Sequence, residues 1–528
     1  MATATATRDG AVTPSVTAAD HALAAILAVV AGFVSALFSW VPSFWTDEAA
    51  SISSADRPVA EIGALISSID AVHAVYYVAL HGWRLVVGDD EFGIRALSVG
   101  AIVLAAAGTY WLGRLTGGRR LGVAAALVFA ILPRVTWAGI EARPFALALA
   151  GGVWATVLLV AATRHRRAGW WIGYALVAGF AVATNIYAAL LVAGHGLSLL
   201  LLRSGRGVLL RWLGAAVGAA VLSSPILLLS VAERGQIAPN PIGFAEWVRN
   251  VLVNQWFLGG TPTGVLPERG TPAWQFAAVA AAAIGWLLVL VGAVAALRRR
   301  ASPAPGTGAP GSWPALAWAL PAVVLPTVVL GVYVLAVDPM YNPRYLTFTS
   351  FAVALLVGVG LLALRRRWWR VVAAALLVAA VAPVWWSQRT PDAKSGADYR
   401  AVGDYLREHA GTGDGVYFAP RSAGETGLIG LSSRRIAVSY PDDFARLTDV
   451  TWAVDAEQSD TIDDLSRPLD QVTARLRAED RLWVVRRIDA PARQRADEDA
   501  VLRSAGLTGG RTVYSGSLDE IAEYRRPG

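Results

Sequence analysis

Residues 22–42, ALAAILAVVAGFVSALFSWVP, form an uninterrupted apolar run, and FWTDEAAS at residues 44–51 follows it almost at once. A run of about 20 apolar residues is long enough to cross a bilayer as a helix. The adjacent carboxylates Asp47 and Glu48 are therefore expected where the chain leaves the membrane. Ionisable side chains at that boundary are costly and are candidates for function. The simpler alternative is that both acids end a helix and stay in water.

Ten further apolar runs follow along the chain, at residues 93–113, 121–139, 144–163, 169–184, 186–202, 210–232, 273–297, 313–336, 345–364 and 370–387. Only 16% of the residues are charged, against about a quarter in soluble proteins. We therefore predict an all-α polytopic membrane protein with about eleven transmembrane helices. The absence of cysteine excludes disulfides, a thiolate nucleophile and a cysteine metal site.

Arginines gather in the short loops that would share one side of this bundle, at residues 114–120, 164–167, 203–211, 298–300 and 365–370. By the positive-inside rule that side is the cytoplasm. Residues 1–21 are then a cytoplasmic tail, and residues 22–389 form the transmembrane domain of a multi-pass plasma-membrane protein. The same clustering explains the net charge of +7 better than a nucleic-acid surface does, so we expect no nucleic-acid partner.

The first outer loop, residues 43–92, is long and partly apolar. Its segments 60–68 and 75–87 are too short to span, and we expect them to be helices lying at the interface. An alternative makes 71–88 a compressed span, but that would move Arg119 and Arg120 to the outer side. Residues 301–312, rich in Pro and Gly, indicate a flexible linker.

Residues 390–528 are charged and contain no run long enough to span a membrane. Their patterning predicts helices at 399–409 and 491–504 and strands at 415–418, 481–485 and 511–515. Alternating strands and helices are typical of a small α/β domain. We therefore expect a C-terminal extracytoplasmic α/β domain.

A polar cluster is predicted on the outer side, from segments far apart in the sequence: Asp47, Glu48, Asp70, His73, Glu141, Arg143, Asp338, Tyr341, Arg344 and Tyr345. A carboxylate can deprotonate an attacking hydroxyl. Arginine or histidine can hold a lipid phosphate and stabilise its charge as it leaves. The cluster therefore predicts transfer of a group from a lipid phosphate to an alcohol.

Most members of the cluster have a structural alternative. His73 would be a plain interfacial residue, Arg143 and Arg344 would be outer-edge anchors, and Glu141 would pair with Arg143 on the surface. Tyr341 and Tyr345 would belong to an aromatic belt. Two further groups have mainly structural interpretations: Asp89, Asp90, Glu91 and Arg95 as a charged helix start, and Asn185 and His195 as hydrogen-bonding residues between helices.

No metal-ligand spacing occurs in the chain, so we expect no cofactor. A divalent cation at the acidic pair Asp47 and Glu48 stays open.

The ordered segments resemble those of polytopic C-type glycosyltransferases, within the superfamily of protein O-mannosyltransferases and lipid A aminoarabinose transferases. The resemblance covers about residues 22–390 and is carried by five segments: Asp47-Glu48, His73-Ala-Val-Tyr-Tyr77, Glu91-Phe-Gly-Ile-Arg95-Ala-Leu-Ser98, Glu141-Ala-Arg143-Pro-Phe-Ala-Leu147 and Asn342-Pro-Arg344-Tyr345. It implies sugar transfer, usually with inversion, from a polyprenyl-phosphate sugar to an extracytoplasmic protein, lipoglycan or polysaccharide.

The resemblance also implies roles for individual residues. Asp47 would be the general base or would orient the acceptor, with Glu48 as its supporting neighbour. His73, Arg143 and Arg344 would lie near the donor phosphate. The usage of Ala, Arg and Gly indicates a GC-rich, actinobacterial genome, for which decaprenyl-phosphate mannose or arabinose is the expected donor. The rival functions are a lipid or sugar transporter and a non-catalytic membrane scaffold.

Overall fold

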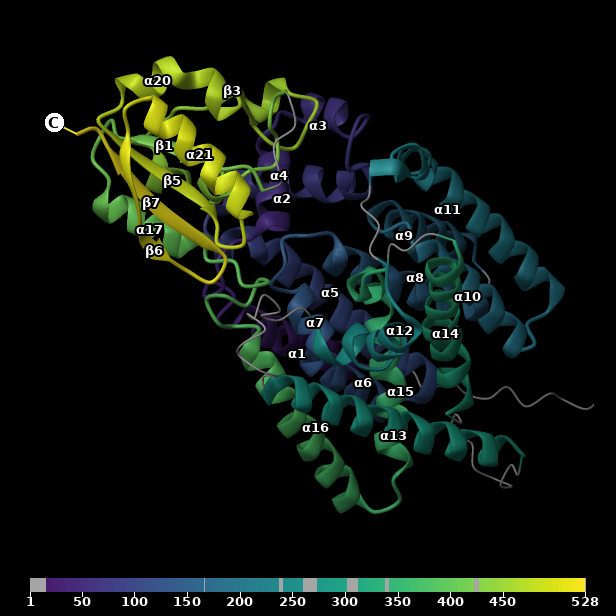
Figure 1. The fold of residues 1–528 in the computed structure, drawn as a ribbon. Helices are drawn as coiled ribbons and strands as arrows, with labels where there is room; N and C mark the ends of the chain where they lie inside the picture. Colours follow the sequence, from purple (N-terminus) through teal and green to yellow (C-terminus); the bar gives the residue numbers. More distant parts are fainter. Residues whose placement is uncertain are drawn as a thin grey trace, which may run out of the picture.

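A bundle of long helices carries a smaller α/β region at one end, drawn in yellow and green in Figure 1. The computed structural model describes residues 16–165, 167–236, 241–259, 273–301, 312–337, 341–421 and 427–527. The predicted fold class, a helical membrane protein with a small C-terminal sheet, is confirmed.

Each predicted apolar run coincides with a helix: α1 (Ala18–Ala36), α5 (Glu91–Gly117), α6 (Arg119–Ile131), α8 (Phe145–His165), α9 (Ala168–Thr184), α10 (Ala188–Leu201), α11 (Arg206–Ala232), α13 (Ala273–Ala301), α14 (Trp313–Ala336), α15 (Ser350–Ala363, preceded by the 3-10 helix η5, Pro343–Thr349) and α16 (Arg367–Ser387). Among the described residues, eight helices are long and apolar enough to cross a membrane. The other three, α6, α9 and α10, have 13, 17 and 14 residues. Length therefore supports eight of the eleven predicted spans.

Two predicted runs end earlier than expected. The run 121–139 stops at Ile131, because Leu132 is extended (ψ 123°) and Pro133 opens a separate helix, α7 (Pro133–Ala138). A residue before proline is biased away from the helical region. The first run ends at Ala36, and Phe38 then adopts a left-handed conformation with φ 59°.

The N-terminal helix starts earlier than predicted, within the segment expected to be a tail. Thr17 and Asp20 form a reciprocal capping box at the start of α1, which satisfies backbone N–H groups that the first turn leaves unpaired. Residues 1–15, most of the predicted linker (302–311) and Asp338 lie outside the described residues.

Small residues and interhelical hydrogen bonds hold the bundle together. A Cβ at Gly113 of α5 would lie 2.8 Å from the Cα of Gly122 in α6, so these backbones are in direct contact. The Asn185 amide donates to the carbonyl of Tyr345 at 2.9 Å. His195 lies between Thr156 and Tyr174, at 2.9 and 3.1 Å. The structural interpretation of Asn185 and His195 is confirmed.

The first loop folds into short helices: α2 (Thr46–Asp56), α3 (Val59–Leu65), the 3-10 turn η1 (Ala71–His73) and α4 (Ala74–Val87). Helices α3 and α4 match the predicted segments 60–68 and 75–87, whereas α2 and η1 had no prediction. With 14 residues, α4 is too short to span a bilayer in helical form. Helix α4 is accordingly not among the eight described helices that are long and apolar enough to cross a membrane. The loop has its own small core, in which Ile52, Ile62 and Tyr77 pack with Phe44.

The C-terminal region contains a five-stranded sheet in the order β2-β1-β5-β7-β6. The strands are β1 (Gly415–Phe418), β2 (Thr448–Asp449), β5 (Arg481–Arg487), β6 (Thr508–Ser515) and β7 (Asp519–Arg525). Strand β1 is parallel to β2 and β5, whereas β7 is antiparallel to β5 and β6. The predicted helices are α17 (Tyr399–His409) and α21 (Ala492–Ser504). Strands β2 and β7 had no prediction.

Both faces of this sheet are covered. On β5, Leu482 and Val484 pack in one core with Leu502 of α21, and Trp483 and Val485 pack in another. A strand buried on both faces needs consecutive apolar residues rather than alternating ones. This explains the uninterrupted run Leu482-Trp-Val-Val485.

Candidate active site

Asp47 lies in the first turn of α2, beside Arg344, which comes from η5, near the end of the transmembrane part of the sequence. Its Oδ2 forms an ion pair with Nη1 of Arg344 at 2.7 Å, and each side chain keeps 22% of its surface exposed. The Arg344 guanidinium also lies 5.6 Å from the ring centres of Trp45 and Phe145. The loop before α2, the start of α8 and η5 therefore meet at Asp47.

Arg143 supplies a second cation to the same place. Its Nη1 lies 3.4 Å from both the Asp47 carbonyl oxygen and the Ser51 hydroxyl, and 3.5 Å from the hydroxyl of Tyr77. The Nε–H groups of Arg143 and Arg344 are buried, and no described residue accepts from them. Two guanidinium groups with spare donors are suited to an oxyanion such as phosphate.

His73 and Asp70 form the third part of the site. The His73 Nδ1 lies 2.5 Å from Asp70 Oδ1, and the Tyr77 hydroxyl donates to the other carboxylate oxygen. Asp70 has φ 62°, a left-handed conformation that Asp adopts more readily than most residues. The chain turns there, and the imidazole is thereby held against the carboxylate.

The electrostatics of the site follow from burial opposed by charge. Desolvation works against ionisation of Asp47, but Arg344 and Arg143 outweigh it and hold the pKa of this carboxyl below its ordinary value. The pKa of Asp70 is lowered in the same way by His73. Burial, with a further contribution from Arg143, lowers the pKa of His73 although Asp70 opposes this. At neutral pH both acids are therefore anionic and His73 is neutral.

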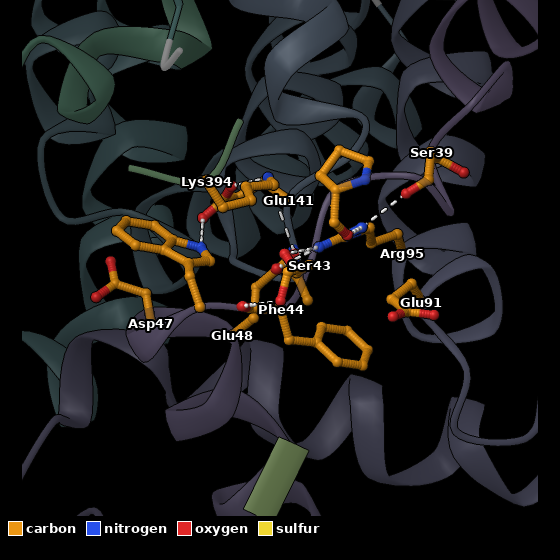
Figure 2. Close-up of polar contacts among 12 residues, drawn as sticks. Ser39, Ser43, Phe44, Asp47, Glu48, Glu91, Arg95, Glu141 and Lys394 are labelled. Atoms are coloured by element: carbon orange, nitrogen blue, oxygen red, sulfur yellow. Dashed lines mark hydrogen bonds and ion pairs between the residues drawn. The ribbon is translucent and has the colours of Figure 1, made fainter. Parts of the chain in front are cut away.

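Glu48, the neighbour of Asp47, points into the protein and not into the site. Its two oxygens accept hydrogen bonds from Nε and Nη2 of Arg95 at 2.9 and 2.6 Å, and both side chains are fully buried. Arg95 also donates to the carbonyls of Ser39, Pro42 and Ser43. Figure 2 shows Arg95 between Glu48 and this loop, with Asp47 lying apart from the pair. Arg95 therefore holds Glu48 and the loop before α2 in place. This corrects the interpretation of Arg95 as only part of a charged helix start.

Glu141 is buried against Lys394 rather than paired with Arg143 on the surface, so the surface-bridge alternative is wrong. One oxygen of Glu141 accepts from Lys394 Nζ, and the other accepts from the indole N–H of Trp45 at 3.0 Å. Lys394 lies 3.9 Å from Glu48. Desolvation raises the pKa of Glu141 and lowers that of Lys394. Trp45 joins this buried cluster to the partly exposed Asp47–Arg344 pair.

The two predicted tyrosines take different places. The Tyr341 hydroxyl donates to Gln255 Oε1 at 2.6 Å, and the residue is almost completely buried, so the membrane-surface alternative fails for it. Tyr345 stacks on Tyr187 with ring centres 5.3 Å apart. Neither hydroxyl has a described contact with Asp47, Arg143 or Arg344.

The C-terminal region fixes the start of α2. The Thr46 hydroxyl lies 2.8 Å from the Tyr399 hydroxyl and accepts from Arg421 at 3.0 Å. Arg435, which is paired with Asp463, donates to the Thr46 carbonyl at 3.2 Å. The residue directly before Asp47 is therefore held from the other side by the α/β region.

A metal ion at the acidic pair does not fit this geometry. Glu48 is committed to Arg95 while Asp47 faces Arg344, so the two carboxylates do not converge. Within the part of the chain that the structure describes, no group of three or more His, Asp or Glu side chains is placed to hold a metal.

Sequence reasoning missed Trp45 and Lys394 and undervalued Arg95. A signal for Lys394 was present, because it is the only lysine among 46 basic residues. A chain that uses arginine everywhere else keeps a compact ammonium where a guanidinium would need more space.

Comparison with known proteins supports the architecture. Two crystal structures of ArnT from Cupriavidus metallidurans, one bound to undecaprenyl phosphate and one in the apo state, align with 96% of this chain and 98% of theirs, at a TM-score of 0.53 and 13% identity. The chain has the ArnT fold. The likeness concerns the fold, and it agrees with the architecture expected from the resemblance.

One protein family and one further solved structure also match the chain. Residues 74–228 match the family described as dolichyl-phosphate-mannose-protein mannosyltransferase. The arabinofuranosyltransferase AftD from Mycobacteria aligns at a TM-score of 0.49 and 14% identity, over 98% of this chain and 42% of that one. No curated protein sequence matches the chain.

Proposed function

We propose that the chain is a membrane glycosyltransferase that moves a sugar from a polyprenyl-phosphate donor to an acceptor hydroxyl. The observation that carries this proposal is the convergence of Asp47, Arg344 and Arg143, with an unused buried Nε–H on each arginine. The match to the mannosyltransferase family, and a neighbour of the same fold that binds undecaprenyl phosphate, agree with it.

In this mechanism the donor phosphate binds between Arg344, Arg143 and His73. Its arrival draws Arg344 away from Asp47, which removes part of the stabilisation that keeps the Asp47 pKa low. Asp47 then accepts the proton of the acceptor hydroxyl, or orients that hydroxyl, for in-line attack at the anomeric carbon. The polyprenyl phosphate leaves as an anion stabilised by the two arginines. In-line attack predicts inversion at the sugar.

The buried residues of the site have a supporting task. Glu48 and Arg95 fix the loop before α2, and Glu141 with Lys394 fixes Trp45, against which Arg344 rests. We therefore assign Glu48 and Glu141 as positioning residues. Tyr341 and Tyr345 remain candidates for substrate binding.

The surroundings follow from the same proposal. The protein lies in the plasma membrane of a bacterium. Its arginine-rich loops face the cytoplasm, while the site and the domain 390–528 face outward. The domain 22–389 holds the donor. The acceptor is a protein, lipoglycan or wall polysaccharide of the cell envelope, and the transferred sugar is mannose or arabinose.

A donor screen tests the proposal. Membranes that contain the full chain are incubated with radiolabelled polyprenyl-phosphate mannose or arabinose, and label in acceptor material is counted. We expect transfer from one donor, and we expect Arg143→Gln/Arg344→Gln to abolish it. Arg84→Gln, which removes a cation paired with Asp56 and Asp89 on the same loop, is the matched control. Donor movement across the membrane without transfer would favour the transporter, and neither activity would favour the scaffold.

A further inference from the structure

A groove of about 640 Å³ lies between α6, α15 and α16, at the opposite end of the bundle from the candidate active site. Its walls are apolar side chains, such as Val123 and Leu127 of α6 and Ala374 and Val378 of α16. Its remaining lining residues include Arg119, Arg120 and Arg370. In Figure 1 the turn between α15 and α16 is at the lower end of the molecule, away from the C-terminal sheet.

The dimensions of the groove fit one lipid leaflet. The α6 wall runs from Val123 to Ile131, a rise of about 12 Å along a helix. The hydrocarbon of a single leaflet is about 15 Å thick. An acyl chain can therefore lie along the whole wall while its headgroup stays at the level of the arginines.

The arginines at the groove are not equivalent. Arg119 is paired with Asp20 at 2.8 Å. Arg370 donates to the carbonyls of Leu362 and Leu364, and no described carboxylate pairs with it or with Arg120. The arginine-rich loops themselves supply no acid, because Asp and Glu are absent from residues 112–122, 163–169, 202–212, 296–313 and 363–371. The charge of two guanidinium groups is therefore left for an external anion.

Two helices also begin at the arginine end of this groove. Helix α6 begins at Arg119 and α16 begins at Arg367, and neither has a side-chain cap on its first turn. Helix N-termini carry a partial positive charge and unpaired N–H groups, so they favour a phosphate. The two helix N-termini therefore favour an anion at the same end of the groove as Arg120 and Arg370.

We propose that this groove binds one anionic phospholipid of the adjacent leaflet, with its phosphate at Arg120 and Arg370 and an acyl chain along α6 and α16. Basic pockets between transmembrane helices are the usual form of such sites. The site is separate from the donor site, and it does not depend on which reaction the chain catalyses.

Native mass spectrometry of the detergent-solubilised full chain tests this, with phosphatidylglycerol and phosphatidylcholine of identical acyl chains as probes. We expect one phosphatidylglycerol to be retained in clear preference to phosphatidylcholine. Each arginine is worth about a fivefold change in affinity for anionic lipid, so Arg120→Gln/Arg370→Gln weakens retention by roughly 25-fold. Arg206→Gln/Arg211→Gln, which removes two exposed arginines from the same end, leaves retention unchanged.

A second variant tests whether the apolar groove is needed for lipid binding, independently of the arginine charges. Ala374→Phe fills the groove at a half-buried wall position and keeps every arginine, so we expect it to release the lipid as well. Thermal melting and gel filtration confirm that each variant is folded. Equal retention of the two phospholipids, equal loss in both double variants, or full retention by Ala374→Phe would each overturn the proposal.

Discussion

Glu48, the residue after Asp47, forms a fully buried, doubly hydrogen-bonded ion pair with Arg95. Glu48 Oε1 also accepts from the backbone N–H of Ala142, and Arg95 uses its other donors on three carbonyls. Every strong polar group of the pair is thus satisfied. Its role is to fix the loop from which α2 starts, and so to fix Asp47.

Removal of one partner of this pair should destabilise the protein strongly. Arg95→Met removes both hydrogen-bonded donors of the buried Glu48 carboxylate and leaves Lys394, at 3.9 Å, as its nearest cation; loss of one partner of a buried ion pair costs about 3–5 kcal/mol in comparable cases. The double variant Glu48→Gln/Arg95→Met should recover part of this loss, because no isolated charge remains. Thermal melting of the purified protein in detergent measures both, and a double variant no more stable than Arg95→Met would contradict the account.

Lys394 should affect turnover more than donor binding. Lys394→Met leaves Glu141 unpaired and loosens Trp45, on which Arg344 rests, so we expect kcat to fall about tenfold or more, with little change in KM for the donor. Glu141→Gln/Lys394→Met removes both charges and keeps an acceptor for the Trp45 indole, so it should restore most of kcat. If KM changes instead, Glu141 contacts substrate directly.

The pH profile should report the Arg344–Asp47 pair. Arg344 lowers the pKa of Asp47 against the effect of burial, so the carboxylate is lost only at low pH. In Arg344→Gln that pKa rises, and the acid limb of kcat/KM, which reports the free enzyme, should move upward by about one pH unit or more. Arg84→Gln should leave the limb in place. An unchanged limb in Arg344→Gln would remove Asp47 ionisation from the rate.

Donor binding should weaken as pH rises because of His73. Its Nδ1 is occupied by Asp70, so the neutral ring has no second N–H for the phosphate, whereas the protonated ring does. The pKa of His73 is lowered in the free protein and should rise when the phosphate binds. Affinity for a sugar phosphodiester, measured between about pH 5 and pH 8, should therefore fall with pH in the wild type and stay flat in His73→Gln. Equal slopes would exclude a phosphate contact.

The sequence predicted the parts of this structure that local patterns control. Apolar runs located all eleven bundle helices, and the apolar run of β5 located its strand. The acidic strand β7 was missed, because its burial comes from pairing with β5 and β6. The break at Leu132 depends on the local effect of Pro133 and could have been predicted.

For the site, candidate residues could be predicted from the sequence, but the directions in which their side chains point could not. Asp47 and Glu48 are neighbours with the same chemistry, and only the partners Arg344 and Arg95, which come from distant segments, distinguish them. Lys394 belongs to a segment after the last bundle helix, and its pairing with Glu141 depends on how the α/β region packs on the bundle. Such long-range pairings have no periodic signal in the sequence.

Sugar transfer by Asp47→Asn is the most direct test of the central claim, that an acidic side chain beside two arginines performs the chemistry. The substitution keeps size and removes charge, so label transfer from the preferred polyprenyl-phosphate sugar should fall by about 10²–10⁴-fold. Asp56→Asn, which neutralises an exposed acid on the same helix, should stay near wild-type activity. Wild-type transfer by Asp47→Asn would contradict the account.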